Sequence, residues 1–312
     1  MKNDFFVERS VCPICGSKDA ICILSIPFDS DVMITYLKSF YNKQGGIRDF
    51  SIFNSVSYEL MQCGCCSLIY QKFIPDDNLM YKLYEEFIDP EIKKREVFGG
   101  KVNLSNHNRL LSKEIEYLIK KVPEKKEPIK FLDYGMGWGL LCKVAISYKC
   151  DTYGTELSTS KIEYAKNNGV KVVLFEELEK YRFDIINLSD VLEHVSEPYL
   201  LIDKLKKVLT VNGIIRISVP WGNNVDQFLS MPLFSRELNS VAPLEHINCF
   251  SSESLRFLAK RLNMKAIGAL DYIYYSTNEN RNYMGRFKFF IKRNILHPYY
   301  YRISTNLMFK KI

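Results

Sequence analysis

Three glycines and an acid follow one apolar run in the stretch "FLDYGMGWGLL", residues 131–141, in the order D-x-G-x-G-x-G. They are Asp133, Gly135, Gly137 and Gly139. Glycine lets the backbone approach a ligand closely, as in the turns that join a strand to a helix. The P-loop pattern GxxxxGK is absent, and a dinucleotide GxGxxG fails because Leu140 occupies its last glycine position. An acid at the end of the strand suits a ligand that carries a cationic amino acid group.

Two further acids stand where later strands of the same region are predicted to end. Glu156 closes "YGTE", where a carboxylate can accept hydrogen bonds from both hydroxyls of a ribose. Asp190 opens "DVLEHV" after the fourth strand. A glycine loop alone is weak support, but the loop with these acids indicates a nucleoside ligand with a positive end.

The first 66 residues hold six of the nine cysteines, including two CxxC pairs, "CPIC" and "CGCC". Cys12, Cys15, Cys63 and Cys66 can supply four thiolates to a tetrahedral zinc ion, which would make a closed, structural site. Alternatives are four buried reduced cysteines, or Cys65 in place of one ligand. A redox CxxC is disfavoured because neither pair lies in a βαβ pattern. The insertion between the pairs predicts a short helix, a Gly-Gly turn and a strand.

After residue 127, apolar runs alternate with amphipathic segments of helical length. Strands are predicted in "IKFLDYG", "DTYGTEL", "VKVVLF", "FDIINLSD" and "GIIRISVP", with helices between them, one of which begins at Ser158. This alternation predicts an α/β fold with a Rossmann-like, doubly wound parallel sheet. We expect a four-cysteine zinc module over residues 1–75, a helical linker over 76–126 and the α/β domain over 127–312.

The formal net charge of +7 is carried by the end of the chain. From residue 281 onward there are eight Lys or Arg and no Asp or Glu, so the first 280 residues carry about −1. This weakens any expectation that the main body follows a nucleic-acid backbone. The N-terminus lacks the apolar segment of a secretory signal, and no apolar run is long enough to span a bilayer, so we expect a cytoplasmic protein.

The motifs together resemble class I S-adenosylmethionine-dependent methyltransferases. Similarity is strongest to bacterial enzymes of sugar or surface-glycan biosynthesis that carry an N-terminal zinc module, and it runs from "CPICGS" through "LDYGMGWG" and "VLEHVSEP" to "PLEHINCFSSESL". The resemblance implies that the glycine loop with Asp133 surrounds the methionine and ribose parts of the cofactor. It implies that Glu156 holds the ribose, that Asp190 approaches the cofactor, and that Glu176 or Glu177 lies near the adenine.

The same resemblance implies the residues of the reaction. Methyl transfer needs alignment of donor and acceptor, and a base when the acceptor is a hydroxyl or an acidic carbon. "EHINCFSSESL" matches the family segment in which His246, next to Glu245, accepts the acceptor's proton, and His194 matches a second active-site histidine. The alternatives are that His246 only neighbours a helix and that His194 only supports its loop. His107 and His297 are interpreted as structural or surface groups.

The resemblance favours O-methylation of a sugar in a surface glycan such as capsule or lipopolysaccharide. Sugar C-methyltransferases continue into a large C-terminal domain, whereas only about forty residues follow "DYIYY" here. Methylation of a nucleic-acid base is disfavoured because the NPPY-type segment is missing. The alternatives are a C-methyltransferase acting on a nucleotide sugar, and a catalytically silent module that docks to nucleic acid or to a partner.

The basic end of the chain is predicted to contain an insertion at residues 281–303. "TNLMFKK" should pair antiparallel with "AIGALDYIYY", and residues 282–297 should form a helix with Phe287, Phe290 and Ile291 near one face. Such a helix could lie peripherally on the inner membrane face and reach a lipid-linked acceptor. Alternatively its aromatic face packs on the catalytic domain.

Overall fold

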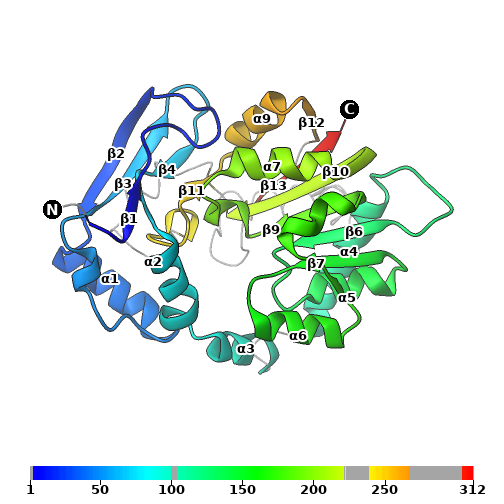
Figure 1. Ribbon diagram of the computed structural model, residues 1–312, viewed down its shortest axis with the longest axis horizontal. Coiled ribbons are helices and arrows are strands. Elements are labelled where there is room, and N and C mark those ends of the chain that lie inside the picture. The colour runs from blue at the N-terminus through cyan, green and yellow to red at the C-terminus, as the bar shows by residue number, and fades with distance from the viewer. Residues whose placement is uncertain (1–2, 100–103, 221, 223–238, 268–303, 312) are drawn as a thin grey trace, which may run out of the picture. The chain divides into compact units, whose positions relative to one another are not determined.

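The computed structural model describes residues 3–99, 104–220, 222, 239–267 and 304–311 (Figure 1). The chain divides into two compact units. Unit 1 comprises residues 1–107 and 224–249, and unit 2 comprises 108–223 and 250–312. Unit 1 therefore extends past the expected end of the cysteine module at residue 75, and it takes in residues 224–249, which the sequence pattern places in the α/β domain.

Unit 1 is built on a four-stranded antiparallel sheet in the order β11-β4-β3-β2. Its elements are β1 (Phe6–Glu8), β2 (Ala20–Pro27), α1 (Asp31–Tyr41), a 3-10 turn (Ser51–Phe53), β3 (Ser57–Cys63), β4 (Ile69–Gln71), β5 (Phe73–Pro75), η5 (Asn239–Val241) and β11 (Asn248–Cys249). The predicted helix and strand between the CxxC pairs are thus confirmed, whereas the turn lies at residues 42–44 and Gly45 forms an isolated bridge with Ile88. Residues 248–249 come from far along the chain, and their pairing with β4 explains why they belong to this unit.

The core of unit 1 is aromatic. Phe6, Phe28, Phe53 and Tyr58 are almost fully buried, and the rings of Phe28 and Phe53 stack with their centroids 5.5 Å apart. Helix α1 begins at Ser30, whose hydroxyl accepts from the Met33 amide. A core of this kind gives a small unit enough apolar area to hold its strands together.

Most of the described residues in the segment expected to be a helical linker, 76–126, lie in helices. They are α2 (Asp77–Lys82), a π-helical turn (Leu83–Phe87), α3 (Pro90–Phe98) and α4 (Leu104–Ile119). Asp76 begins α2 by accepting from the Leu79 amide, and Asp89 begins α3 ahead of Pro90. Most of α4 belongs to unit 2 rather than to a separate linker.

Unit 2 contains a seven-stranded sheet in the order β12-β13-β10-β9-β6-β7-β8. Its elements are β6 (Lys130–Tyr134), α5 (Leu140–Ser147), β7 (Asp151–Thr155), α6 (Thr159–Asn167), β8 (Lys171–Val172), η3 (Phe175–Lys180), β9 (Phe183–Ser189), η4 (Leu192–His194), α7 (Pro198–Lys207), β10 (Leu209–Pro220), α9 (Ser252–Arg261), β12 (Met264–Ile267) and β13 (Ser304–Lys311). Strands β6 to β10 run parallel, which confirms the predicted doubly wound α/β fold. Strand β8 is shorter than predicted because it is the edge strand and pairs only at two positions of β7.

The order of the strands sets the place of the glycine loop. Strand β7 lies on one side of β6, and β9 lies on its other side. The order in which strands are added to the sheet therefore reverses at β6. Ligands of open α/β sheets bind at the carboxyl ends of the strands at such a switch point. The loop at 135–139 begins at that end.

One face of the sheet carries helices α4 and α5. Their apolar residues pack with Phe131 of β6, Ile185 of β9 and Ile214 of β10, all fully buried. Because strand residues alternate in direction, Asp133, Asn187 and Arg216 lie on this same face, two positions further along their strands. On the face covered by these helices, the central strands thus carry buried polar residues as well as buried apolar ones.

The last strand completes the sheet. Strand β13 lies antiparallel between β10 and β12, with Ala266 opposite Phe309 and Ile267 opposite Met308. The predicted pairing of "TNLMFKK" is confirmed at these residues. The remaining predicted partner residues and the insertion at 281–303 lie outside the described residues.

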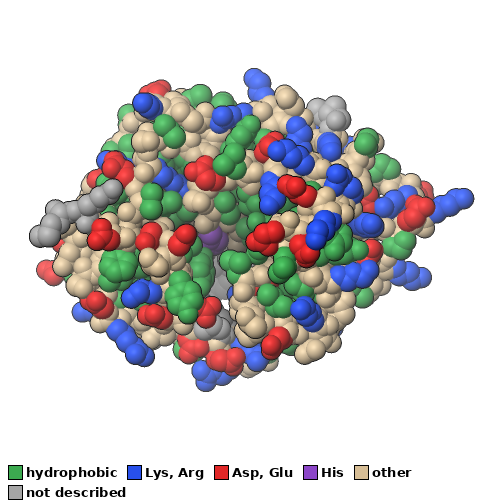
Figure 2. Space-filling model, viewed as in Figure 1, with side chains coloured by type: hydrophobic (Ala, Val, Ile, Leu, Met, Phe, Trp, Pro, Cys, Tyr) green, Lys and Arg blue, Asp and Glu red, His purple; other side chains and the backbone are tan. Residues whose placement is uncertain are grey.

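On the face shown in Figure 2, Lys and Arg side chains are interspersed with Asp and Glu side chains. In the ranges that the structure describes, no helix has the length and apolar character needed to cross a membrane.

The ion pair between Arg216 and Glu114 supports a prediction about the stability of unit 2. Their charged atoms are 2.9 Å apart and both residues are buried. We expect Arg216→Met to lower the free energy of unfolding by about 3–5 kcal/mol, because it leaves the Glu114 carboxylate buried without its counter-charge. The double variant Arg216→Met, Glu114→Gln should recover part of the lost free energy of unfolding, as measured by calorimetry.

Lys207→Met provides the control, since it removes a surface pair with Asp203 at 3.0 Å. Its effect should stay below about 1 kcal/mol. Equal losses in the single and double variants of the buried pair would contradict the interpretation.

Candidate functional site

The glycine loop of unit 2 adopts a conformation that only glycine adopts easily. Gly135, Gly137 and Gly139 have φ of 70°, 55° and 68°, all in the left-handed region. A side chain at Gly135 would also collide with Val191, at 2.8 Å from its Cγ2. At Gly137, by contrast, no described atom lies within 4 Å of where a Cβ would stand. The loop is therefore enclosed at one end and open in its middle, where a ligand can approach the backbone.

Glu156 connects the second strand to this loop. Its Oε2 accepts from the Gly137 amide at 2.9 Å, and its Oε1 accepts from the amides of Leu157 and Ser158. These three donors orient the carboxylate at the carboxyl end of β7. Oε1 already accepts two hydrogen bonds, so it is Oε2 that keeps lone-pair capacity for a hydroxyl donor, as the predicted ribose-binding role requires.

Asp133 lies deeper than the sequence suggested. It is 4% exposed, and its Oδ1 accepts from Asn187 Nδ2 at 2.7 Å, while the Cys142 thiol lies 3.7 Å from Oδ2. Burial raises the pKa of Asp133 to about 6, with a smaller contribution from the nearby Glu114 carboxylate. Asp133 is thus held between β9 and α5, two residues before the first glycine of the loop.

A polar network that sequence reasoning missed continues from Asp133 across the sheet. Asn187 Oδ1 accepts from Arg216 Nη1 at 2.9 Å, and Arg216 Nη2 donates to Asn306 at 2.9 Å. Arg216 also contacts Glu114 and the Ser189 hydroxyl. The available signal was an amide and a cation inside the otherwise apolar runs "FDIINLS" and "GIIRISVP".

The segment after β9 carries the other residues predicted in unit 2. Asp190 has a φ of 53°, unusual for a residue other than glycine, and its amide donates to the Ser218 carbonyl at 2.8 Å. His194 ends the short η4 turn, with its Nε2 3.8 Å from Glu193 Oε1. A strained backbone like that of Asp190 is common where the chain approaches a ligand. Of the two predicted adenine-side acids, Glu177 is engaged by Lys180 at 2.7 Å, and Glu176 is exposed.

Glu245 and His246 belong to unit 1. His246 is 6% exposed, and its amide donates to the Ala242 carbonyl. Glu245 Oε1 accepts from the Tyr41 hydroxyl at 2.9 Å, and burial, then the Glu245 carboxylate, raise the pKa of Tyr41 well above its usual value. The pair is therefore held within unit 1 by groups of the cysteine module.

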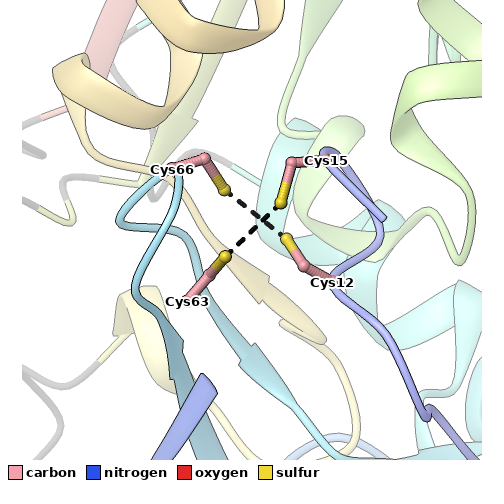
Figure 3. Close-up of side chains that lie close together, drawn as sticks. All are labelled: Cys12, Cys15, Cys63 and Cys66. Carbon is pink, nitrogen blue, oxygen red and sulfur yellow. Dashed lines mark hydrogen bonds between the residues drawn. The ribbon is translucent and has the colours of Figure 1, made fainter. Parts of the chain in front are cut away.

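The four predicted cysteine ligands meet at one point in unit 1 (Figure 3). Their sulfur atoms all lie within 4.8 Å of one another, with Cys12 to Cys66 at 3.5 Å and Cys15 to Cys63 at 3.4 Å. Sulfurs that bind one zinc ion at ~2.3 Å stand roughly 3.8 Å apart, so the donor set fits a closed tetrahedral site. Cys65 is exposed and is not among the four.

The two knuckles have matching backbones. In one, Gly16 donates to the Cys12 carbonyl, and in the other Ser67 donates to the Cys63 carbonyl. Both donors have left-handed φ, 75° and 57°. Within the cluster, the neighbouring Cys66 thiol lowers the pKa of Cys12 to about 5, which favours a thiolate ready for a metal ion.

Asp133 gives a prediction about stability and pH. Its pKa is raised from 3.8 to about 6 in the folded chain, so the native state binds the proton more tightly than the unfolded state. Stability from this group is full below about pH 4 and is lost as pH rises through about 6. Asp133→Asn should therefore raise the free energy of unfolding at pH 8, by up to about 3 kcal/mol.

The gain should disappear near pH 4, in denaturant titrations over this range. Asp203→Asn, at a half-exposed position of α7, is the control and should shift stability little at either pH. A variant that is less stable than the wild type at pH 8 would disprove this account of Asp133.

Comparison with known proteins agrees with this fold. A family model described as a methyltransferase domain matches residues 104–267, more than half of the chain. The ubiquinone biosynthesis O-methyltransferase of Pelagibacter ubique (strain HTCC1062) is 32% identical over 152 residues, which cover 44% of this chain and 60% of that protein. That of Chelativorans sp. (strain BNC1) is 31% identical over 104 residues, covering 30% and 40%. The chain thus spans less than two thirds of these curated relatives.

Among solved structures, magnesium protoporphyrin IX methyltransferase from Synechocystis PCC 6803 with bound SAH is 14% identical, with a TM-score of 0.49 over 76% of this chain and 100% of that chain. The plantazolicin methyltransferase BpumL, in complex with a monoazolic desmethylPZN analog and SAH, is 15% identical, with a TM-score of 0.49 over 75% of this chain and 93% of that chain. Since the family model spans β6 to β12, the glycine loop and the acids around it, the chain belongs to the methyltransferase domain family.

Proposed function

We propose that the protein is an S-adenosylmethionine-dependent methyltransferase that transfers a methyl group to a hydroxyl of a sugar in surface-glycan biosynthesis. The observation that carries the cofactor assignment is the left-handed glycine loop at the switch point, tied to Glu156 through the Gly137 amide. The sugar acceptor rests on the sequence resemblance of the four-cysteine module and the Glu245–His246 segment.

The residues of unit 2 fit the parts of this cofactor. Glu156 would accept from the ribose hydroxyls, and the open backbone at Gly137 would admit the ribose and methionine chain. Asp133 would contribute its negative charge from beneath the loop, toward the cationic end. Asp190, with its strained backbone, would border the cofactor on the β9 side.

The chemistry divides between cofactor and protein. S-adenosylmethionine, when bound, supplies a methyl group on a positively charged sulfur. His246 would accept the proton of the acceptor hydroxyl, Glu245 would orient that histidine or its substrate, and His194 is the second candidate base. Glu245 is itself held by the Tyr41 hydroxyl.

A second candidate acceptor follows from the relatives. The curated proteins similar to this chain are named ubiquinone biosynthesis O-methyltransferases, which supports transfer to oxygen and makes a hydroxyl of that pathway the alternative acceptor. Carbon methylation of a nucleotide sugar and a silent docking module remain weaker hypotheses. Peripheral membrane contact through residues 281–303 remains a proposal from sequence only.

The acceptor can be tested directly. Mass spectrometry of surface glycans and of quinones from a deletion strain should show one lost methyl group. Loss from a glycan supports the sugar acceptor, and loss from the quinone pool with intact glycans overturns it.

Glu156→Ala tests the cofactor assignment. Removing charge-assisted hydrogen bonding to the ribose should raise the Kd for S-adenosylmethionine in isothermal titration by roughly 10- to 150-fold for each bond lost, since each is worth about 1.5–3 kcal/mol. Glu163→Ala, an exposed position on α6, is the matched control and should bind as the wild type does. Unchanged affinity of Glu156→Ala would refute the ribose role.

His246→Ala tests the assignment of the base. We expect kcat to fall by roughly two to four orders of magnitude while S-adenosylmethionine still binds, because proton transfer by a positioned base contributes that much. His194→Ala, measured in parallel, discriminates between the two histidines. A larger loss in His194→Ala, with near-normal turnover in His246→Ala, would transfer the role to His194.

A further inference from the structure

The segment that carries Glu245 and His246 is held by side chains of the cysteine module. We define the Glu-His segment as residues 239–249. The Gln71 side-chain amide donates to two of its carbonyls, Ala242 at 3.2 Å and His246 at 3.1 Å. The backbone amide of Gln71 donates to the Ile247 carbonyl at 3.0 Å. One residue of β4 therefore fixes the chain on both sides of His246.

Further contacts reach the same segment from other parts of unit 1. Arg9 Nη1 donates to the Ile247 carbonyl at 3.2 Å and to Asn248 Oδ1 at 2.8 Å. The Tyr58 hydroxyl donates to the Val241 carbonyl. Strand β4 also pairs with β11, placing Asn248 opposite Tyr70. These contacts join residues about 170 to 240 positions apart in the chain, so the Glu-His segment depends on the module for its conformation.

The cysteine cluster is placed to control these contacts. Arg9 stands three positions before Cys12, and β4 begins three positions after Cys66. Strand β3, which pairs with β4, ends at Cys63. A metal ion bound by the four thiolates would link the chain segment that carries Arg9 to the segment that carries Gln71, close to both residues.

The energetic weight of Gln71 comes from its burial. Gln71 is 0% exposed, and the residues whose carbonyls it satisfies, Ala242 and His246, are 3% and 6% exposed, so these carbonyls have little access to water in its absence. Leaving a buried polar group without its hydrogen bond costs the full free energy of desolvating that group, which is more than the net contribution of the bond to stability. Loss of this amide should therefore loosen the backbone on both sides of His246.

We propose that the four-cysteine module is a positioning device for Glu245 and His246, with Gln71 and Arg9 as the positioning residues. Metal loading then controls the order of the Glu-His segment, and through it turnover, while the glycine loop of unit 2 binds S-adenosylmethionine independently. The effect on turnover rests on the proposed function of His246; the effect on order does not.

The test compares Gln71→Met with Gln62→Met in the full-length protein. Both replace an amide by a side chain of similar length in the same sheet, but Gln62 makes none of these contacts. Gln71→Met should speed hydrogen exchange of amides 242–249 at least about tenfold and lower kcat by a similar factor. The Kd for S-adenosylmethionine should stay within about twofold, and Gln62→Met should leave all three quantities unchanged.

Arg9 supplies a milder pair of variants, should Gln71→Met fold poorly. Arg9→Leu should show the same pattern with smaller size, and Arg9→Lys, which keeps a cationic donor, should recover part of it. A purely structural role would change folding yield in both without separating kcat from cofactor affinity.

Metal removal completes the test. Metal analysis of the purified chain should show about one zinc ion, as expected for four thiolates, and its removal by a chelator should speed exchange in residues 242–249. Cys12→Ser should behave likewise, and Cys22→Ser, at an exposed cysteine of β2, should not. Unchanged exchange after zinc loss and in Gln71→Met would overturn the proposal. Faster exchange together with normal turnover in His246→Ala would retain the positioning role and reject the proposed base.

Discussion

The guanidinium of Arg216 is buried in the central sheet of unit 2, and its neutralisation constrains the elements around it. Arg216 is 6% exposed within a strand whose neighbouring residues are fully buried and apolar. A buried charge is tolerated only when it is paired and hydrogen bonded. Its partners come from three other elements, with Glu114 on α4, Asn187 on β9 and Asn306 on β13. Neutralising Arg216 therefore requires both the strand order β13-β10-β9 and the position of α4 beside it.

The same constraint extends to the glycine loop through one side chain. Asn187 accepts from Arg216 with its oxygen and donates to Asp133 with its nitrogen, so its amide has only one suitable orientation. Asp133 then stands directly before the three left-handed glycines. A chain of polar contacts that begins at α4 thus fixes the end of β6, from which the loop starts. Its open middle, near Gly137, is left for the ligand.

Local patterns in the sequence were sufficient for the α/β sheet, the glycine loop and the four cysteines. Each of these depends on neighbours in the chain, such as the apolar runs of β6 and β9 or the CxxC spacing. The membership of residues 239–249 in unit 1 could not be found this way, because it depends on pairing between β11 and β4, nearly 180 positions apart. The depth of Asp133 also escaped, since the acid's burial is set by α4, α5 and Asn187 rather than by its own strand. Arg216 left a trace only as a charge within an apolar run.

Both units hold a segment of the proposed site by the same physical means, a buried side-chain amide. Asn187 does so beneath Asp133 in unit 2, and Gln71 does so beside His246 in unit 1. An amide has no charge to lose or gain with pH, and its donors and acceptors are fixed in direction. It can therefore hold a titratable group in place in either protonation state of that group. A carboxylate or an imidazole in the supporting position would couple the geometry of the segment to its own titration. For residues whose proposed work depends on charge and proton transfer, such a support adds no further titrating group, and its own hydrogen bond favours one protonation state, as the bond from Asn187 opposes the burial that raises the pKa of Asp133.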